Sequence, residues 1–125
     1  MRSLVERFFH RFGRHSERSV GRKRTATQSV IGLIDDSLAD GHTILTADLN
    51  GDGSGEVIAG YRGKGVNVYY AQDAEGAEWK KVVLDNSIAA AACAIADLNG
   101  DGRPDIACIG AATANLKWYE NLGRP

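Results

Sequence analysis

The chain has 125 residues, 43% of them hydrophobic, so it can bury one modest core and a single domain is expected. Its net charge of −1 at pH 7 indicates no particular class of partner. No stretch approaches the roughly 20 apolar residues of a membrane span. Charges also interrupt every apolar cluster near the start, so neither a transmembrane segment nor a secretory signal is expected.

Charge is divided unevenly along the chain. Residues 1–24 hold eight Lys and Arg against two acids, a balance of +6, whereas residues 25–125 hold seven against fourteen, or −7. Within residues 1–24, apolar residues recur at the spacing of one face of a helix: Leu4, Val5, Phe8, Phe9 and Phe12. We expect residues 1–26 to form a basic arm, either a short helix that covers an apolar edge of the body or a tail. A presequence and a helix lying on a membrane are the alternatives. GRKR is short and has no aromatic platform beside it, so no nucleic-acid partner is expected.

The body of the chain repeats itself with a shift of 49 residues. DLNGDG at residues 48–53 recurs at 97–102, and the flanking TILTADL and EVIAGY match ACAIADL and DIACIG in character. A period of roughly 40 to 50 residues is typical of propeller blades, each a four-stranded antiparallel sheet. The sequence therefore predicts an all-β fold, a partial β-propeller of about two blades. Its domain would span residues 27–125, with repeats at about 43–85 and 92–122.

Short β-rich segments bounded by turn signals predict the strands. The first repeat supplies four of them: Thr43–Ala47, Val57–Tyr61, Val66–Ala71 and Trp79–Leu84. The second repeat supplies three: Ala91–Ala96, Ile106–Gly110 and Leu116–Asn121. Alanine favours helices, but the match of ACAIADL with TILTADL favours a strand in the alanine-rich segment. Upstream, Gln28–Ile34 is predicted to be the outer strand of a preceding blade.

The two cysteines flank the second acidic loop. If that hairpin pairs Asp97 with Asp105, Cys93 lies opposite Ile109, and Cys108 lies one step away, opposite Ala94. Residues one step apart point to opposite faces of a sheet, so a disulfide is not expected. The sequence instead predicts two buried thiols, which indicate no redox compartment.

Each DLNGDG opens a nine-residue loop that is rich in oxygen ligands. Hard cations such as calcium take roughly six to eight oxygens from carboxylates, amides, carbonyls and water. Side chains at positions 1, 3, 5 and 9 with a carbonyl at position 7 can enclose one ion, and glycines at positions 4 and 6 permit positive φ. In the first loop these ligands are Asp48, Asn50, Asp52, the carbonyl of Ser54 and Glu56. In the second loop they are Asp97, Asn99, Asp101, the carbonyl of Arg103 and Asp105.

A plain hairpin turn is the simpler interpretation, since Asn-Gly and Asp-Gly are common in hairpins. Three acids within nine positions repel one another, however, unless a cation neutralises them, and the arrangement occurs twice. We therefore predict two calcium sites, while the lack of soft ligands disfavours zinc and copper. An EF-hand is disfavoured because Ala59 and Cys108 occupy position 12, where that loop needs Glu. Leu49 and Leu98, at position 2, should face the core.

The repeats resemble the FG-GAP/VCBS repeats of integrin-like β-propellers, whose blades carry a calcium loop of pattern DxNxDGxxD between their first two strands. The resemblance covers roughly residues 27–125. More narrowly, GHTILTADLNGDGSGEVIAGYRGKG and ADLNGDGRPDIACIGAATANLKWYEN are similar to the terminal blades of propellers related to aldos-2-ulose dehydratases. The resemblance implies a calcium-binding structural or interaction module in an extracellular or periplasmic location. The alternative that it implies is a remnant or subunit of a carbon–oxygen lyase acting on ketoaldose sugars, with a carbohydrate ligand.

One residue is a candidate for catalysis. His42 precedes the innermost strand, where the axial opening of a propeller would lie, and could act there as a metal ligand or a general base in sugar chemistry. A solvated or capping histidine is the alternative. Two blades and a fraction cannot close a ring that normally takes about four to eight. The expected partners are therefore further blades or other copies of the chain, unless the chain is a truncated remnant.

Overall fold

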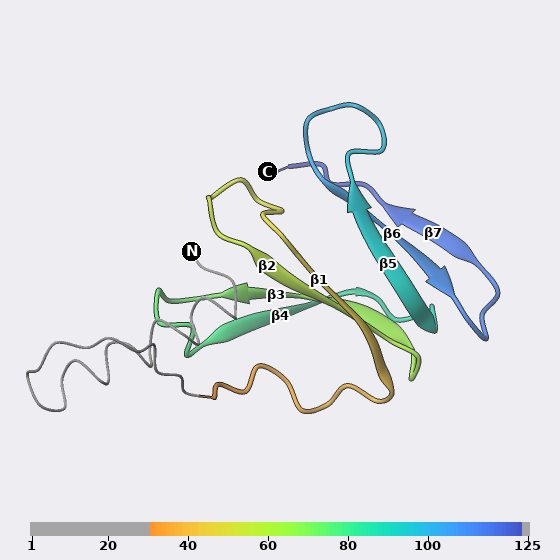
Figure 1. The fold of residues 1–125 in the computed structure, drawn as a ribbon, viewed down its shortest axis with the longest axis horizontal. Coiled ribbons are helices and arrows are strands. Elements are labelled where there is room, and N and C mark those ends of the chain that lie inside the picture. The colour runs from red at the N-terminus through yellow and green to blue at the C-terminus, as the bar shows by residue number, and fades with distance from the viewer. Residues whose placement is uncertain (1–30, 124–125) are drawn as a thin grey trace, which may run out of the picture.

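The computed structural model describes residues 31–123, in which seven strands form two antiparallel sheets (Figure 1). The first sheet contains β1 (Gly41–Ala47), β2 (Glu56–Tyr61), β3 (Gly65–Ala71) and β4 (Trp79–Asp85), in that order. The second contains β5 (Ala90–Ala96), β6 (Asp105–Gly110) and β7 (Leu116–Tyr119), also in sequence order. The all-β partial propeller of about two blades is therefore confirmed, whereas the predicted arm at residues 1–26 lies outside the described residues. Across residues 31–123 there is no helix that could span a membrane.

The strand predictions hold to within one or two residues at most ends. The alanine-rich segment is strand β5, and the last strand ends at Tyr119 and not at Asn121. The predicted strand Gln28–Ile34 is wrong over its described part, because residues 31–34 pair with no strand. No sheet of a preceding blade lies beside them among the described residues, so their backbone has no partner to pair with.

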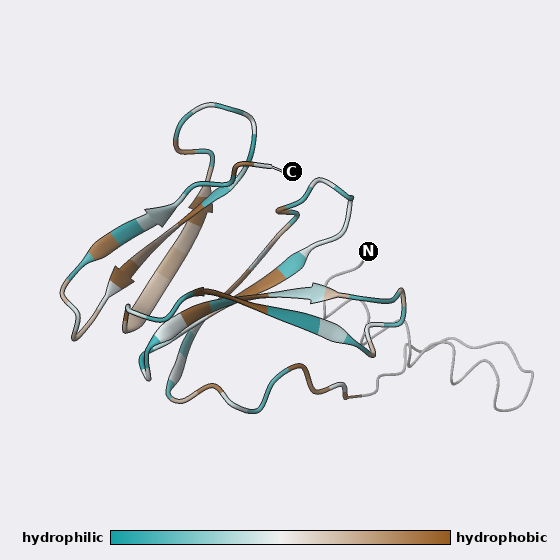
Figure 2. Ribbon diagram, turned by 180° about the vertical axis from the view of Figure 1, so that it is seen from behind, coloured by the Kyte–Doolittle hydropathy of each residue, from teal (hydrophilic) through white to brown (hydrophobic). Residues whose placement is uncertain are grey.

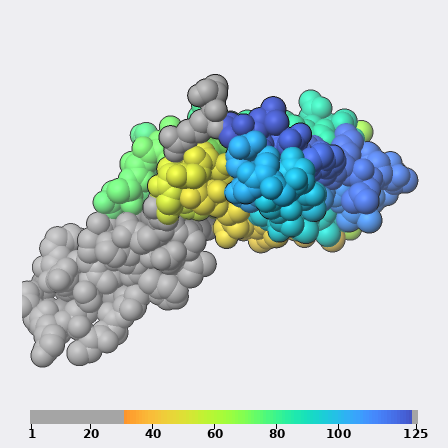
Figure 3. All heavy atoms as spheres, turned by 90° about the horizontal axis from the view of Figure 1, so that it is seen from above, coloured from red at the N-terminus to blue at the C-terminus, as the bar shows by residue number. Residues whose placement is uncertain are grey.

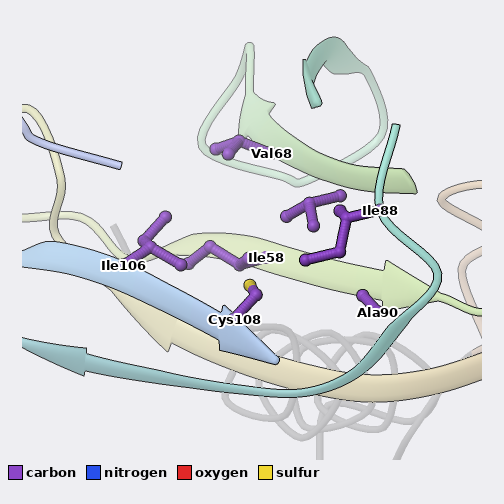
Figure 4. Packing of buried hydrophobic residues seen from close by; sticks show 7 residues of the cluster. Ile58, Val68, Ile88, Ala90, Ile106 and Cys108 are labelled. Carbon is purple, nitrogen blue, oxygen red and sulfur yellow. The ribbon is translucent and has the colours of Figure 1, made fainter. Parts of the chain in front are cut away.

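The core lies between the two sheets, which pack face to face. Ile58, Val66 and Val68 of the first sheet meet residues of the second sheet and of the linker before it (Figure 4). Those residues are Ile88, Ala90, Ile106 and Cys108. In Figure 2 the strands carry apolar segments, whereas the connecting loops are mostly hydrophilic. The two repeats therefore share one core.

A second, smaller cluster covers the opposite face of the first sheet. Val57, Ala59 and Tyr69 are buried there, and Ile34 and Leu38 of the segment before β1 pack over them. This segment therefore lies on the first sheet in the way that the linker residue Ile88 lies on the second.

The two cysteines form a disulfide, so the prediction of two buried thiols is wrong. Asp105 pairs with Ala96 and not with Asp97, which moves the register of β5 and β6 by one residue. Cys93 then lies directly opposite Cys108 on the same face, with their Cα atoms 4.1 Å apart. A change of one residue in register reverses which side chains share a face, and this reversal brings the two sulfurs together.

Leu49 and Leu98 differ although they occupy the same position in their loops. Leu49 packs against the core as expected, whereas Leu98 is 52% exposed. The prediction for Leu98 is wrong because, among the described residues, no sheet covers the side of the second sheet on which it lies.

Candidate metal centre

The first acidic loop joins β1 to β2 and is organised around the carboxylate of Asp48. Its Oδ1 accepts hydrogen bonds from the backbone N–H of Gly51 at 2.8 Å and of Asp52 at 3.1 Å, and its Oδ2 accepts one from Gly53 at 2.8 Å. Gly51 and Gly53 have φ values of 74° and 85°, in the region that glycine adopts without strain. The loop therefore closes around its first residue.

The second loop joins β5 to β6 and repeats this arrangement. Asp97 accepts from Gly100 at 2.8 Å, from Asp101 at 3.1 Å and from Gly102 at 2.8 Å. The two glycines again have positive φ, 77° and 85°. The six identical residues DLNGDG thus form the same loop in both repeats.

Three carboxylates converge in each loop. Oxygens of Asp48, Asp52 and Glu56 all lie within 4.8 Å of one another, and so do oxygens of Asp97, Asp101 and Asp105. The last acid of each set, Glu56 or Asp105, is buried at the start of the second strand. Such a set of hard oxygen donors suits a cation such as calcium.

The remaining predicted ligands lie in the same loops. Asn50 and Asn99 accept weak hydrogen bonds through Oδ1 from the backbone N–H of Asp52, at 3.3 Å, and of Asp101, at 3.4 Å. The roles of the Ser54 and Arg103 carbonyls stay predictions. Each loop therefore presents its side-chain oxygens from positions 1, 3, 5 and 9 on a compact turn.

The electrostatics of the first loop favour a bound cation. Burial raises the pKa of Glu56, and the charges of Asp52 and Asp48 add to this, although the N–H of Leu49 donates to its Oε1 at 2.6 Å and opposes the rise. In contrast, the hydrogen bond from Gly53 holds the pKa of Asp48 below its usual value. A divalent cation among these groups would relieve the repulsion around Glu56.

The second loop differs in carrying its own cation. Arg103 donates through Nη2 to Oδ2 of Asp101 at 2.9 Å and through Nε to the carbonyl of Asn121 at 2.9 Å. Ser54 occupies the equivalent position in the first loop, where no such ion pair forms with Asp52 among the described residues. A metal ion in the second loop would therefore share Asp101 with a guanidinium group.

Asn121 ties the two loops together, which the sequence did not predict. Its Nδ2 donates to the carbonyls of Leu49 at 2.7 Å and Pro104 at 3.1 Å, and its N–H donates to Oδ1 of Asp105 at 2.8 Å. Figure 3 shows the first loop (yellow) beside the second sheet (blue). Because Leu49 lies 72 residues away in sequence, no local pattern identifies this contact.

A second repeated cluster fixes each linker to the sheet that follows it. Tyr119 donates to Oδ2 of Asp85 at 2.6 Å, Lys117 lies 3.0 Å from the same oxygen, and Ser87 donates to Oδ1 through its N–H and its hydroxyl. We call this cluster the second latch. It holds the end of β4 and the following linker against β7 of the other sheet.

The first latch repeats the aspartate, serine and tyrosine 50 residues earlier, whereas its lysine comes from β4 and has no equivalent in the second latch. Tyr69 donates to Oδ2 of Asp35 at 2.5 Å, Lys81 lies 3.4 Å away from that oxygen, and Ser37 donates to Oδ1. Burial, followed by the Asp35 hydrogen bond, raises the pKa of Tyr69 to about 12. The spacing of Asp-x-Ser in IDDS and LDNS was the sequence signal for this motif, but the sequence does not identify its partners.

The latches predict a loss of stability in acid. Burial would raise the pKa of Asp85, but hydrogen bonds from Tyr119 and Ser87 outweigh this and hold it well below the usual range. A carboxyl with a depressed pKa contributes stability above its unfolded value, about 3.9, and that stability is lost as pH falls toward the folded value. Asp85→Asn should therefore flatten the fall in unfolding free energy below about pH 4 in urea titrations. Asp36→Asn, a change at an exposed residue beside the first latch, should keep the wild-type slope, and equal slopes for both variants would contradict this.

His42 lies within β1 and not before it. Its Nδ1 lies 2.8 Å from the carbonyl of Ala91 in β5, and its Nε2 lies 3.2 Å from Nη1 of Arg62. Both ring nitrogens thus have partners, and the contact with Ala91 joins the first sheet to the second. A catalytic role for His42 stays a prediction, and this geometry supplies a structural role.

One comparison with known proteins finds a match. Residues 48–108 match the family model described as FG-GAP-like repeat. No curated protein and no solved structure matches the chain significantly. The matched segment begins at Asp48, the first residue of the first acidic loop, and ends in β6, so it contains both acidic loops.

Proposed function

This chain is an FG-GAP/VCBS repeat protein, and we propose that it is a calcium-binding β-propeller module with a structural or interaction role. Two clusters of three carboxylates, with the same loop geometry in both repeats, carry the proposal. The first ion would be held by Asp48, Asn50, Asp52, Glu56 and the carbonyl of Ser54. The second would be held by Asp97, Asn99, Asp101, Asp105 and the carbonyl of Arg103.

A bound cation would act on the fold by neutralising the acids. Each loop joins an inner strand to its neighbour, so it sets how the first two strands of a blade leave the turn. Since the ligands come together only in the folded loop, binding is coupled to folding. Asn121 connects the first loop to the last acid of the second and so links the two sites mechanically.

The surroundings proposed for this module are oxidising. The Cys93–Cys108 disulfide closes the hairpin that carries the second loop. Such bonds persist outside the cell and in the bacterial periplasm and are rare in the cytosol. This supports the extracellular or periplasmic location that the family resemblance implies. The propeller domain that we propose comprises residues 27–125.

Thermal unfolding tests the proposed function. Calcium should raise the melting temperature of chelator-stripped protein. Each occupied site should add about 2.7 kcal/mol to the free energy of unfolding when the calcium concentration is a hundredfold above the dissociation constant of that site. Magnesium should have a smaller effect, because it needs a tighter octahedral shell and dehydrates reluctantly. Identical melting curves in calcium and in chelator would refute the proposal.

A further inference from the structure

The sheet β5–β7 has one face that no other described element covers. Leu116, 75% exposed, and Trp118 lie on this open face. The strand registers place them where Val66 and Val68 stand in the first sheet, and both valines are buried in the core between the sheets. The open face thus corresponds to a face that, within this chain, packs against another sheet.

The opposite end of the molecule offers the complementary face. Ile106 and Cys108, which the second sheet buries against the first, correspond to Val57 and Ala59 of the first sheet. Ile44 pairs with Ala59 on that face and is 66% exposed. The interface between the two sheets therefore has two halves that each occur a second time in the described chain. One is repeated on the open face of β5–β7, and the other is repeated on the face of the first sheet that carries Ile44.

The first latch positions the segment that precedes this complementary face. Asp85 holds the linker that immediately follows β4, the outermost strand of the preceding sheet. Asp35 makes the same contacts with Tyr69, so residues 31–34 stand where the outermost strand of another preceding sheet would end. These residues pair with no strand, and Leu33 is 71% exposed. In the described chain β7 is an edge strand that lacks a fourth strand beside it.

We propose that a second copy of this chain docks head to tail on the open face of β5–β7. Residues 31–34 of one copy extend the sheet of the other at β7, and the face carrying Ile44 covers Leu116 and Trp118. Such an interface is heterologous, so it propagates until a ring closes. Because propellers have about four to eight blades, copies with two sheets each would close as assemblies of about two to four. The proposal goes beyond the proposed function and rests on the repeated packing, not on bound metal.

Sedimentation equilibrium of the full chain, in calcium and in chelator, measures the assembly. The apparent molecular mass of the wild type should rise with concentration toward that of about two to four chains. Leu116→Glu should reduce it to the mass of a single chain. The matched control is Leu122→Glu, because Leu122 is 74% exposed but lies by the cleft between the two sheets. The control should assemble like the wild type. Far-UV circular dichroism should show native strands in both variants, because both side chains are exposed.

Mixing variants tests the head-to-tail direction. Ile44→Glu should also give single chains, because Ile44 lies on the face that docks on Leu116 and Trp118. Mixed with Leu116→Glu chains it should form dimers only, since one intact interface then remains. A wild type that stays monomeric at all concentrations, or Ile44→Glu chains that assemble normally, would overturn the proposal. A third result would also overturn it: a monomeric wild type whose β7 amides are protected from hydrogen exchange and lose this protection when residues 1–24 are deleted. In that case residues 1–24 of the same chain, and not a second copy, would cover β7. Loss of calcium binding with assembly intact would refute the proposed function alone.

Discussion

Replacing Ile58 with alanine should lower the free energy of unfolding by about 2–5 kcal/mol. Ile58 is fully buried and lies between side chains of both sheets, including Val68 and Ile106 (Figure 4). Removing its outer carbons leaves a cavity at the centre of the shared core, which the two sheets can close only by moving together. Both sheets should still unfold in one transition, because neither retains a complete core without the other.

The matched control for this prediction is Ile44→Ala in the neighbouring strand β1. Ile44 is largely exposed in the single chain, so at a concentration at which chains do not assemble its truncation should change the free energy of unfolding by no more than about 0.5 kcal/mol. Urea unfolding followed by circular dichroism and by tryptophan fluorescence measures both variants, since Trp79 and Trp118 report on different sheets. Similar losses for the two variants, or separate transitions for the two probes, would show that the repeats do not share one core.

Replacing Asp97 with alanine should remove one of two calcium ions from the chain. Asp97 supplies the first predicted ligand of the second loop and also accepts the three backbone hydrogen bonds that close it. Alanine removes the ligand and the turn together, so affinity at this loop should fall by about 100-fold or more. The first loop should keep its ion, because its own carboxylates remain in place.

The matched variant is Asp48→Ala, which makes the same change in the first loop. Each single variant should bind one ion by titration calorimetry, and the double variant should bind none. Asp101→Asn offers a milder change in the second loop, because it retains an oxygen ligand and removes the partner of Arg103. If Asp97→Ala binds two ions, or if the two variants lose different numbers of ions while folded, the loops do not each hold one ion.

Much of the fold could be predicted because the repeat encodes it locally. Glycines with positive φ, closely spaced acids and alternating apolar residues specify each loop and its strands within about twenty residues. The same local pattern identified Asp48, Asp52 and Glu56 as neighbours, as the structure shows. An internal repeat also compensates for ambiguous segments, since β5 could be recognised as a strand only by its match with β1.

The errors arose where the outcome depends on distant contacts. The Cys93–Cys108 pairing depends on a register that differs by one residue from the symmetric placement of Asp97 and Asp105. Leu98 repeats the local sequence of Leu49, but its exposure is set by what covers the sheet. Asn121 of the second repeat donates a hydrogen bond to the Leu49 carbonyl of the first repeat, so no pattern within either repeat could indicate this contact.

Titration calorimetry of calcium into the folded, chelator-stripped wild-type chain tests the central claim most directly. The paired carboxylate loops predict two ions bound for each chain. The second site should differ in affinity from the first, because Arg103 already pairs with Asp101 there. No heat of binding from a chain that circular dichroism shows to be folded would contradict the account.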